Sequence, residues 1–364
     1  MERIFAPIGQ GCFAIERFRD GVVIFDCGTL TKIRNKSCVE SISLRIEQEI
    51  DSNETIRYVF ISHLDEDHVN GLAFLLNKYK VKEVVLPLLY DEYKELYLGK
   101  LLESSKKTYD DLSLLIKQPE SFVREHSRYD TKTILVAPVN YEKIEEEPNQ
   151  TILRSGTEFP FGNWVFIPYN YLYKTKAEKL KKYLLDGGIN PDDFKLQHKV
   201  EVFMTDDSIL QSIKAAYQKV NKDLNQNSMT VYSGPNGPSC STMRIIETGY
   251  SIKCECNLQG KWEKVSCLYT GDYNASTDSR WNDLRDSYRK YWNNIGVLQI
   301  PHHGAASSYN DNIGNLECLL VINAGTNNQN RHPSPSVLYK LFKTKRTIFW
   351  VSEEDASKVR FEII

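Results

Sequence analysis

No stretch of this sequence is apolar for long enough to cross a membrane as a helix, which takes about 20 residues. The chain also begins without the basic and then apolar segments of a secretory signal. Both absences argue against a membrane-bound or exported protein. We therefore expect a cytoplasmic protein with no membrane partner.

The chain also has almost no net charge. Its 46 lysines and arginines nearly balance its 48 aspartates and glutamates, so the net charge is −2. Such a chain is no polycation, so binding to nucleic acid would need a local basic surface or metal ions. The 41% of hydrophobic and 26% of charged residues are typical of a globular protein with a core. Its 364 residues correspond to one large domain or two ordinary ones.

The eight cysteines contain no CxxC pair. Cys27 and Cys267 sit in apolar runs typical of strands, where a free thiol acts as a small buried hydrophobe. Cys254 and Cys256 leave a metal site open as an alternative, but reduced structural thiols fit the whole set better.

Apolar runs alternate with helical patterns along the chain. Runs at 22–25, 58–61, 81–87, 297–300, 319–323 and 347–351 predict strands, as do the β patterns at 133–167, 228–232, 243–256 and 262–269. Helical patterns lie at 39–50, 69–79, 88–130 and about 334–343. Residues 1–30 predict two short strands joined by a turn at Arg19-Asp-Gly21. This alternation predicts an α/β fold with polar residues collected at strand ends.

We predict a single domain over residues 1–364, because no repeat, linker or low-complexity segment interrupts the chain. Residues 171–223 form a lysine-rich helical insertion within it. A run of charge is usually a solvated face, although this one could also follow a phosphate backbone.

The strongest chemical signal is the run His63-Leu-Asp65-Glu-Asp67-His68, directly after the apolar residues 58–61. Alternate residues of an extended segment point the same way, so His63, Asp65 and Asp67 can converge. His68 would turn toward them where the next helix begins. Carboxylates this close repel unless a cation neutralises them, so the run predicts a metal site. The alternative is a polar turn that caps a helix, which needs only one such residue.

Two later apolar runs also end in metal-binding residues. The run that ends at Tyr269 leads to Asp272, and the run that ends at Ile300 leads to His302 and His303. Counting the earlier run from His63 to His68, four of the seven histidines of the chain lie in the three strand-end segments. This clustering favours one shared site over scattered core histidines.

Together these motifs resemble the metallo-β-lactamase superfamily and, within it, the ComEC-like hydrolase branch (DNA-internalisation competence protein), as a stand-alone soluble member. The matching segments are Phe25–Gly28, Ser62–Gly71, Val81–Pro87, Asn227-Ser228, Thr270–Asp272, Pro301–Gly304 and Asn330–Pro335. They run in order through nearly the whole chain, apart from 88–132 and 170–224. The resemblance implies a four-layer αβ/βα sandwich with a two-metal site along its edge.

The resemblance also implies which residues hold the two divalent ions. His63 and Asp65 would bind one metal, Asp67 and His68 the other, Asp272 would bridge both, and His303 or its neighbour His302 would complete the second site. Three residues would support these ligands without touching a metal, namely Asp26, Asn227 and Ser228.

Two departures from the superfamily pattern bear on the metals. The second histidine of the usual His-x-His-x-Asp-His motif is Asp65 here, and a carboxylate suits Mn²⁺ or Mg²⁺ as well as Zn²⁺. The superfamily also commonly places a ligand histidine between this motif and the bridging aspartate. Only His126 and His198 lie there, and neither follows an apolar strand end. We therefore expect the first metal to be weakly held.

Two cations about 3.5–4 Å apart stabilise the attacking and leaving oxygens of a displacement at phosphorus. We expect a phosphodiesterase or nuclease that cleaves nucleic acid or a nucleotide by attack of metal-bound hydroxide. Asp67 and Asp272 would fix this hydroxide, and His302 or His332 would contact the phosphate or protonate the leaving oxygen.

Substrate contacts are less specific in the sequence. Arg331 precedes a predicted helix, whose N-terminus suits an anion. Trp281, Arg285 and Arg289 could stack on bases and hold phosphates, or the aromatic residues could form the core face of a helix. Two other functions remain open: a hydrolase of an ester, thioester or lactam bond, and an inactive binding or regulatory module on the same fold. A partner protein is also left open.

Overall fold

The computed structural model describes most of the chain. The described residues are 1–90, 93–94, 97–98, 101, 106–139, 151–171, 175–196, 199, 202–203, 205–219, 228–253 and 260–364. None of the helices in this part combines the length and apolarity that a membrane span requires.

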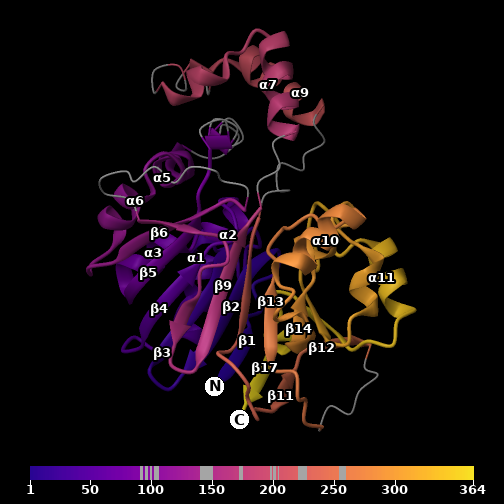
Figure 1. Ribbon diagram of the computed structural model, residues 1–364. Helices are drawn as coiled ribbons and strands as arrows, with labels where there is room; N and C mark the ends of the chain where they lie inside the picture. Colours follow the sequence, from indigo (N-terminus) through magenta and orange to yellow (C-terminus); the bar gives the residue numbers. More distant parts are fainter. Residues whose placement is uncertain are drawn as a thin grey trace.

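Two β-sheets face each other at the centre of the molecule (Figure 1). The first sheet has nine strands in the order β11-β17-β1-β2-β3-β4-β5-β6-β7. They are β1 (Glu2–Phe5), β2 (Gly11–Phe18), β3 (Gly21–Thr29), β4 (Thr55–Phe60), β5 (Lys80–Pro87), β6 (Lys132–Ala137), β7 (Thr151–Arg154), β11 (Met243–Thr248) and β17 (Val359–Ile363). Because β3 to β7 run parallel, their carboxyl ends lie along one edge.

The second sheet has eight strands in the order β12-β16-β15-β14-β13-β10-β9-β8. They are β8 (Phe159–Phe161), β9 (Trp164–Asn170), β10 (Met229–Pro235), β12 (Tyr250–Lys253), β13 (Ser266–Tyr269), β14 (Ile295–Gln299), β15 (Leu319–Asn323) and β16 (Ile348–Val351). Strands β13 to β16 are parallel, so the segments after β13 and β14 also leave the sheet at one edge.

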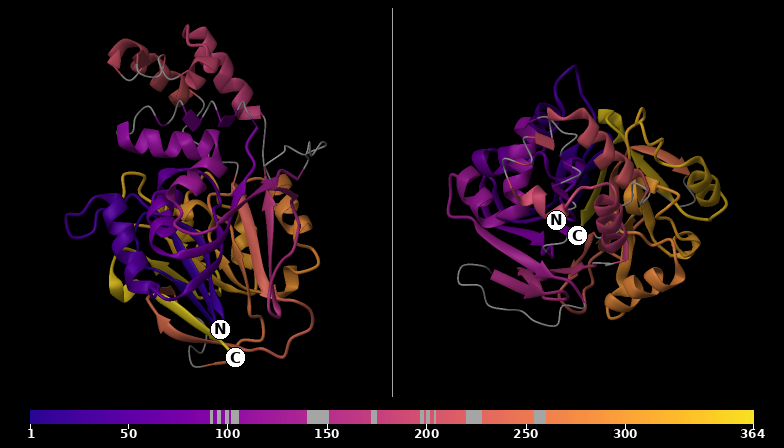
Figure 2. Two further views of the ribbon diagram at one scale, coloured as in Figure 1. Left: turned by 90° about the vertical axis from the view of Figure 1, so that its left-hand side faces the viewer. Right: turned by 90° about the horizontal axis from the view of Figure 1, so that it is seen from above.

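Helices cover the outer face of each sheet (Figures 1 and 2). On the first sheet lie α1 (Cys38–Glu49), α2 (Glu66–Val69), α3 (Leu72–Lys78), α5 (Lys106–Lys117) and α6 (Pro119–His126). On the second lie α10 (Asp278–Ser287) and α11 (Pro335–Phe342). Short 3-10 turns are η1 (Pro191–Lys195), η2 (Trp292–Asn294), η3 (Pro301–Gly304), η4 (Asp311–Asn315) and η5 (Asp355–Ser357). This layering confirms the four-layer αβ/βα sandwich predicted from the sequence.

The strands alternate between two apolar cores, as the period of two in an extended chain requires. In β3, Val23 and Phe25 face the space between the sheets, whereas Val22 and Ile24 face the helices of the first sheet. Phe25 stacks on Tyr269 of the second sheet, with ring centroids 3.6 Å apart. A third apolar cluster lies between the second sheet and its two helices. Each sheet is therefore buried on both faces.

A buried ion pair of the first sheet also faces the space between the sheets. Arg3 donates from Nε to Oε1 of Glu16 at 2.7 Å, and neither side chain is exposed. From the second sheet, Ser233 donates to Oε2 of Glu16 at 2.6 Å and Tyr269 donates to Oε1 at 2.9 Å. The carboxylate of Glu16 is thus satisfied from both sheets, which ties them together.

Helices α7 (Thr175–Asp186) and α9 (Asp207–Lys219) stand beyond the end of the sandwich that lies opposite the two chain termini (Figures 1 and 2). They fall within the predicted insertion 171–223. Leu180, Leu184 and Ile213 are buried in the same apolar cluster that includes the side chains of α5 and α6. The single-domain division, with this segment as an insertion, stays a prediction.

Some elements differ from the sequence prediction. Residues 1–30 form three strands instead of two, and β17 was not predicted. Both β1 and β17 are short, and they pair with each other. The amino group of Met1 donates to the carbonyl oxygen of Ile363 at 3.0 Å, so this pairing joins the two ends of the chain. A pattern of four or five residues is too short to reveal such a pairing.

Candidate metal centre

Three segments from two sheets meet at one end of the sandwich. β4 leads into residues 63–68, and β13 and β14 lead into Asp272 and the pair His302-His303. The Nε2 atoms of His68 and His303 are 3.4 Å apart. In Figure 1, α2 lies at the end of the sandwich that faces α7 and α9. The segments after β4, β13 and β14 thus form one cluster.

Asp272 lies at the centre of this cluster and is buried. Its Oδ2 atom is 3.6 Å from Nε2 of His63 and 3.4 Å from Nε2 of His302. Its Oδ1 atom is 3.2 Å from Nε2 of His68 and 3.5 Å from Nε2 of His303. Each oxygen of the carboxylate therefore faces two imidazoles. This is an arrangement in which one carboxylate could serve two metal ions.

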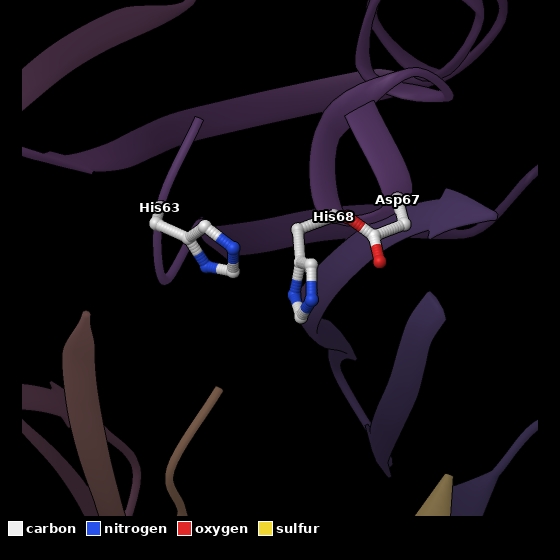
Figure 3. Close-up of side chains that lie close together, drawn as sticks. All are labelled: His63, Asp67 and His68. Carbon is white, nitrogen blue, oxygen red and sulfur yellow. The ribbon is translucent and has the colours of Figure 1, made fainter. Parts of the chain in front are cut away.

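Two further carboxylates lie beside these histidines. Oδ2 of Asp65 is 3.6 Å from Nε2 of His63, and Oδ2 of Asp67 is 3.4 Å from Nε2 of His303. Two groups of possible metal ligands have their atoms within 4.8 Å of one another: His63, Asp67 and His68, and His68, Asp272 and His303. Figure 3 shows the first group, with the rings of His63 and His68 side by side and Asp67 beyond His68.

Asp26, in β3, positions the segment from Ser62 to His68. Its Oδ1 atom accepts a hydrogen bond from the backbone N–H of Ser62 at 2.7 Å, and its Oδ2 atom accepts one from the Ser62 hydroxyl at 2.8 Å. Oδ2 also lies 2.7 Å from Nδ1 of His68. A carboxylate at Nδ1 keeps the proton there, which turns Nε2 toward Asp272. Asp26 itself has a left-handed backbone (φ 53°), which is uncommon outside glycine.

Two glycines let the strands approach α2 closely. A Cβ atom at Gly28 would lie 2.6 Å from backbone atoms of Asp67 and His68. A Cβ atom at Gly11 would lie 2.7 Å from the carbonyl oxygen of Asp67. Both distances are shorter than side chains tolerate, so glycine is needed at both positions. The contact fixes the start of α2, and with it Asp67 and His68, against β2 and β3.

Opposite charges balance inside this buried cluster. Burial would raise the pKa of Asp272, but the neighbouring histidines, His302 first, hold it well below its ordinary value. Burial would lower the pKa of His68, but the carboxylates, Asp26 first, raise it well above its ordinary value. The buried carboxylates therefore favour positive charge beside them, which a divalent cation would supply.

The residues present fit divalent metal ions. Nε2 of His63 is buried and has no hydrogen-bond partner among the described residues. Buried polar atoms without a partner are rare, and an unplaced ion is one explanation. Imidazole and carboxylate together suit Zn²⁺ and Mn²⁺. The identity and number of the metal ions stay predictions.

Ser228 and His332 also lie at the cluster. The hydroxyl of Ser228 accepts a hydrogen bond from the backbone N–H of Asp272 at 3.1 Å, which supports that loop. The ring centroid of His332 is 5.5 Å from that of His302. Arg331, beside it, is exposed. Asn227 lies outside the described residues.

Trp281 and Arg285 lie on α10, and Arg289 follows the end of this helix. Trp281 is buried and packs edge-on against Trp292, with ring centroids 5.5 Å apart. This favours the alternative in which Trp281 belongs to the core face of a helix, because little of its ring is left for a base to stack on. Arg285 and Arg289 are exposed and pair with Asp286.

His126, which the sequence analysis considered as a further ligand histidine, contacts its own helix. It lies on α6, where its Nδ1 atom is 2.9 Å from the carbonyl oxygen of Phe122. Its ring packs on Phe122, with centroids 4.3 Å apart. His198 lies outside the described residues.

Tyr97 is a candidate site residue that the sequence analysis did not identify. It is 3% exposed, and its hydroxyl has no hydrogen-bond partner in the described part of the chain. Burial raises the pKa of Tyr97 well above its ordinary value, and the charges of Asp65 and Asp272 raise it further. Its hydroxyl is thus close enough to both carboxylates to interact with them electrostatically. The sequence gives no signal for it, since it is one of 21 tyrosines and follows no strand-end motif.

Comparison with known families supports the superfamily that the motifs predict. Residues 9–168 match the model of the metallo-beta-lactamase superfamily. This segment includes Asp26 and the whole run from His63 to His68, and the two-sheet architecture is that of the metallo-β-lactamase fold. The narrower ComEC-like branch stays a prediction.

Individual relatives are distant. The chain is 25% identical over 163 residues to ribonuclease J of Mycoplasma genitalium and 25% identical over 158 residues to that of Mycoplasma pneumoniae. Each match covers 41% of this chain but only 26% of the ribonuclease. Among solved structures, the short form of human tRNase Z has a TM-score of 0.38 and 10% identity, covering 82% of this chain and 77% of that chain. The metallo-beta-lactamase fold protein YhfI from Bacillus subtilis has a TM-score of 0.38 and 8% identity, covering 100% of this chain and 98% of that chain.

Proposed function

We propose that this protein is a metal-dependent hydrolase that cleaves phosphodiester bonds in a nucleic acid or a nucleotide. The observation that carries the proposal is the buried carboxylate of Asp272, which faces four imidazoles contributed by both sheets. Divalent ions bound there would lower the pKa of a water molecule and polarise a phosphate. The similarity of part of the chain to ribonuclease J supports nucleic acid as the substrate class.

The ions would be held by residues of both sheets. The ligands would be His63 and Asp65 on one side, Asp67, His68 and His303 on the other, and Asp272 between them. Asp67 and Asp272 would also hold the attacking water in place, because a carboxylate oxygen can accept a hydrogen bond from it.

The substrate would approach from the side of Asp67 and His302. Their side chains are 13% and 12% exposed, whereas those of His63 and Asp272 are 1% and 2% exposed. His332 lies on this side, next to His302. It is therefore suited to contact the scissile phosphate or to donate a proton to the leaving oxygen.

Tyr97 would donate its hydroxyl to a phosphate oxygen of the bound substrate. Replacing Tyr97 with phenylalanine should lower kcat/KM about ten- to a hundredfold, because a hydrogen bond to a charged group contributes about 1.5–3 kcal/mol. Metal content should not change, because the hydroxyl is not one of the proposed ligands. Steady-state kinetics together with elemental analysis measure both effects.

Tyr79→Phe is the matched control for this substitution. Tyr79 is also buried, but its hydroxyl donates to the carbonyl oxygen of Ile50, which lies after α1. Its loss should leave kcat/KM unchanged. Equal kcat/KM values for Tyr97→Phe and the unmodified protein would rule out a substrate contact for Tyr97.

The function itself is tested with a substrate panel. Protein stripped with a chelator is reloaded with Zn²⁺, Mn²⁺ or Mg²⁺ and incubated with single- and double-stranded DNA, RNA and cyclic dinucleotides. We expect metal-dependent cleavage of at least one of these, and none by Asp67→Ala. The same preparations are offered a thioester, a lactone and a β-lactam.

Two outcomes of this panel would contradict the proposal. Cleavage of a carbonyl substrate with every phosphodiester left intact would indicate an ester, thioester or lactam hydrolase. Less than one metal ion per chain, with no thermal shift on adding Mn²⁺ or Zn²⁺, would indicate a binding or regulatory module on this fold.

A further inference from the structure

His302 and His303 are sequence neighbours that face the two different oxygens of one carboxylate. Nε2 of His302 is 3.4 Å from Oδ2 of Asp272, and Nε2 of His303 is 3.5 Å from Oδ1. Both histidines have left-handed backbones, with φ of 51° and 53°. Non-glycine residues adopt this conformation at a cost, and two in succession indicate that the surrounding structure holds both rings where they are.

Each of the two rings is also anchored at its other nitrogen. Nδ1 of His303 is 2.7 Å from the carbonyl oxygen of Asn323, which can only accept a hydrogen bond. That contact leaves Nε2 of His303 with a free lone pair. Nδ1 of His302 is 2.9 Å from the hydroxyl oxygen of Ser308, which can accept in the same way. His302 is therefore oriented like His303, with Nε2 turned toward Asp272.

The same pattern holds for the two histidines of the first sheet. Nδ1 of His68 faces Oδ2 of Asp26 at 2.7 Å, and Nδ1 of His63 faces the hydroxyl oxygen of Ser62 at 3.0 Å. This hydroxyl donates to Asp26, so it is free to accept from His63. A hydrogen bond at Nδ1 that presents Nε2 is how proteins orient histidine ligands of metals.

The four histidines divide into pairs at Asp272. His68 and His303 share its Oδ1 side, where Asp67 also lies. His63 shares the Oδ2 side, and Asp65 lies beside His63. The Oδ2 side would have only one imidazole if His302 were left out. With His302, each side has two imidazoles and one further carboxylate.

We propose that His302 is a ligand of the first metal ion, together with His63, Asp65 and Asp272, while His303 serves the second. This inference rests on the proposed metal-dependent function and deepens it. His302 thereby takes the position of the superfamily histidine that His126 does not supply. This ligand role replaces the phosphate contact that the sequence predicts for His302. Nδ1 of the ring contacts Ser308, and Nε2 would bind the metal ion. His332 keeps the phosphate contact.

The number of histidine ligands can be counted directly. In protein loaded with Co²⁺, the Nδ1–H proton of each bound histidine gives a strongly shifted, exchangeable ¹H NMR signal. We expect four such signals that vanish in D₂O, one each from His63, His68, His302 and His303. Three signals would overturn the proposal, as would failure to bind Co²⁺. The count needs no catalysis, so an inactive protein with four signals would contradict the proposed function and still support this inference.

Substitution assigns His302 to one of the two ions. For His302→Gln we expect metal content to fall from two ions per chain to one. Removing a residue that only hydrogen-bonds to a metal ligand lowers metal affinity about 10- to 100-fold. Because His302 would itself be a ligand, the affinity for the lost ion should drop by more than that. His332→Gln is the matched control, because its ring lies beside His302, and it should retain two ions. Two ions bound by folded His302→Gln, judged by circular dichroism, would overturn the assignment.

Discussion

Replacing Asp272 with asparagine is expected to lower kcat/KM by at least ~10³-fold, or about 4 kcal/mol of transition-state stabilisation. An amide has no charge and only one oxygen, so it could bind a metal ion on one side but not on both. Whichever side its nitrogen faces, the two imidazoles there would no longer share a carboxylate oxygen with a bound ion. We also expect the variant to hold fewer metal ions, as measured by elemental analysis on the same samples.

Asp355→Asn provides the matched control for this substitution. Asp355 accepts a hydrogen bond from Arg45 at 2.6 Å, but its side chain is 66% exposed and it belongs to η5, outside the metal cluster. Loss of a surface ion pair changes stability by about 0–1 kcal/mol and should leave activity unchanged. Asp272 would not bridge the ions if Asp272→Asn retained both of them and cleaved its substrate within about tenfold of the unmodified rate.

Replacing Glu16 with alanine should lower the free energy of unfolding by about 3–5 kcal/mol, the range measured when one partner of a buried ion pair is removed. Arg3 would keep its charge with no counter-ion, and the hydroxyls of Ser233 and Tyr269 would lose their acceptor. Urea unfolding followed by circular dichroism measures this loss.

A double substitution separates the ion pair from the rest of this network. Arg3→Met combined with Glu16→Leu removes both charges, and apolar replacements of a buried pair are often tolerated. We expect the double variant to be more stable than the sum of the two single effects predicts, by about 1–3 kcal/mol. Additive losses would show that Arg3 and Glu16 act independently.

The sequence predicted the layers and the meeting of the three strand-end segments, because both depend on where buried strands end. An apolar run that stops at a cluster of carboxylates and imidazoles marks the edge of a sheet. The runs that end at Ile61, Tyr269 and Ile300 all did so. Parallel neighbours within each sheet then bring these ends to one edge, which is why distant motifs meet.

Other features depend on backbone conformation or long-range pairing, which the pattern of residue types does not reveal. Nothing in the sequence Pro-His-His-Gly indicates the two successive left-handed residues that turn both His302 and His303 toward Asp272. The edge pairing of β1 with β17 joins residues from opposite ends of the chain. Tyr97 lies outside the strand-end motifs, so only its burial near Asp65 and Asp272 draws attention to it.

The position of His68 and His303 has a consequence for how the protein denatures. They are 235 positions apart and come from opposite halves of the sandwich, yet their Nε2 atoms lie 3.4 Å from each other. An ion bound by both would act as a removable cross-link that the unfolded ensemble lacks, and ligands of the native state alone shift the unfolding equilibrium by mass action. Removing the ion with a chelator would then lower the free energy of unfolding. The concentration of free metal would thus determine the stability of the fold as well as turnover.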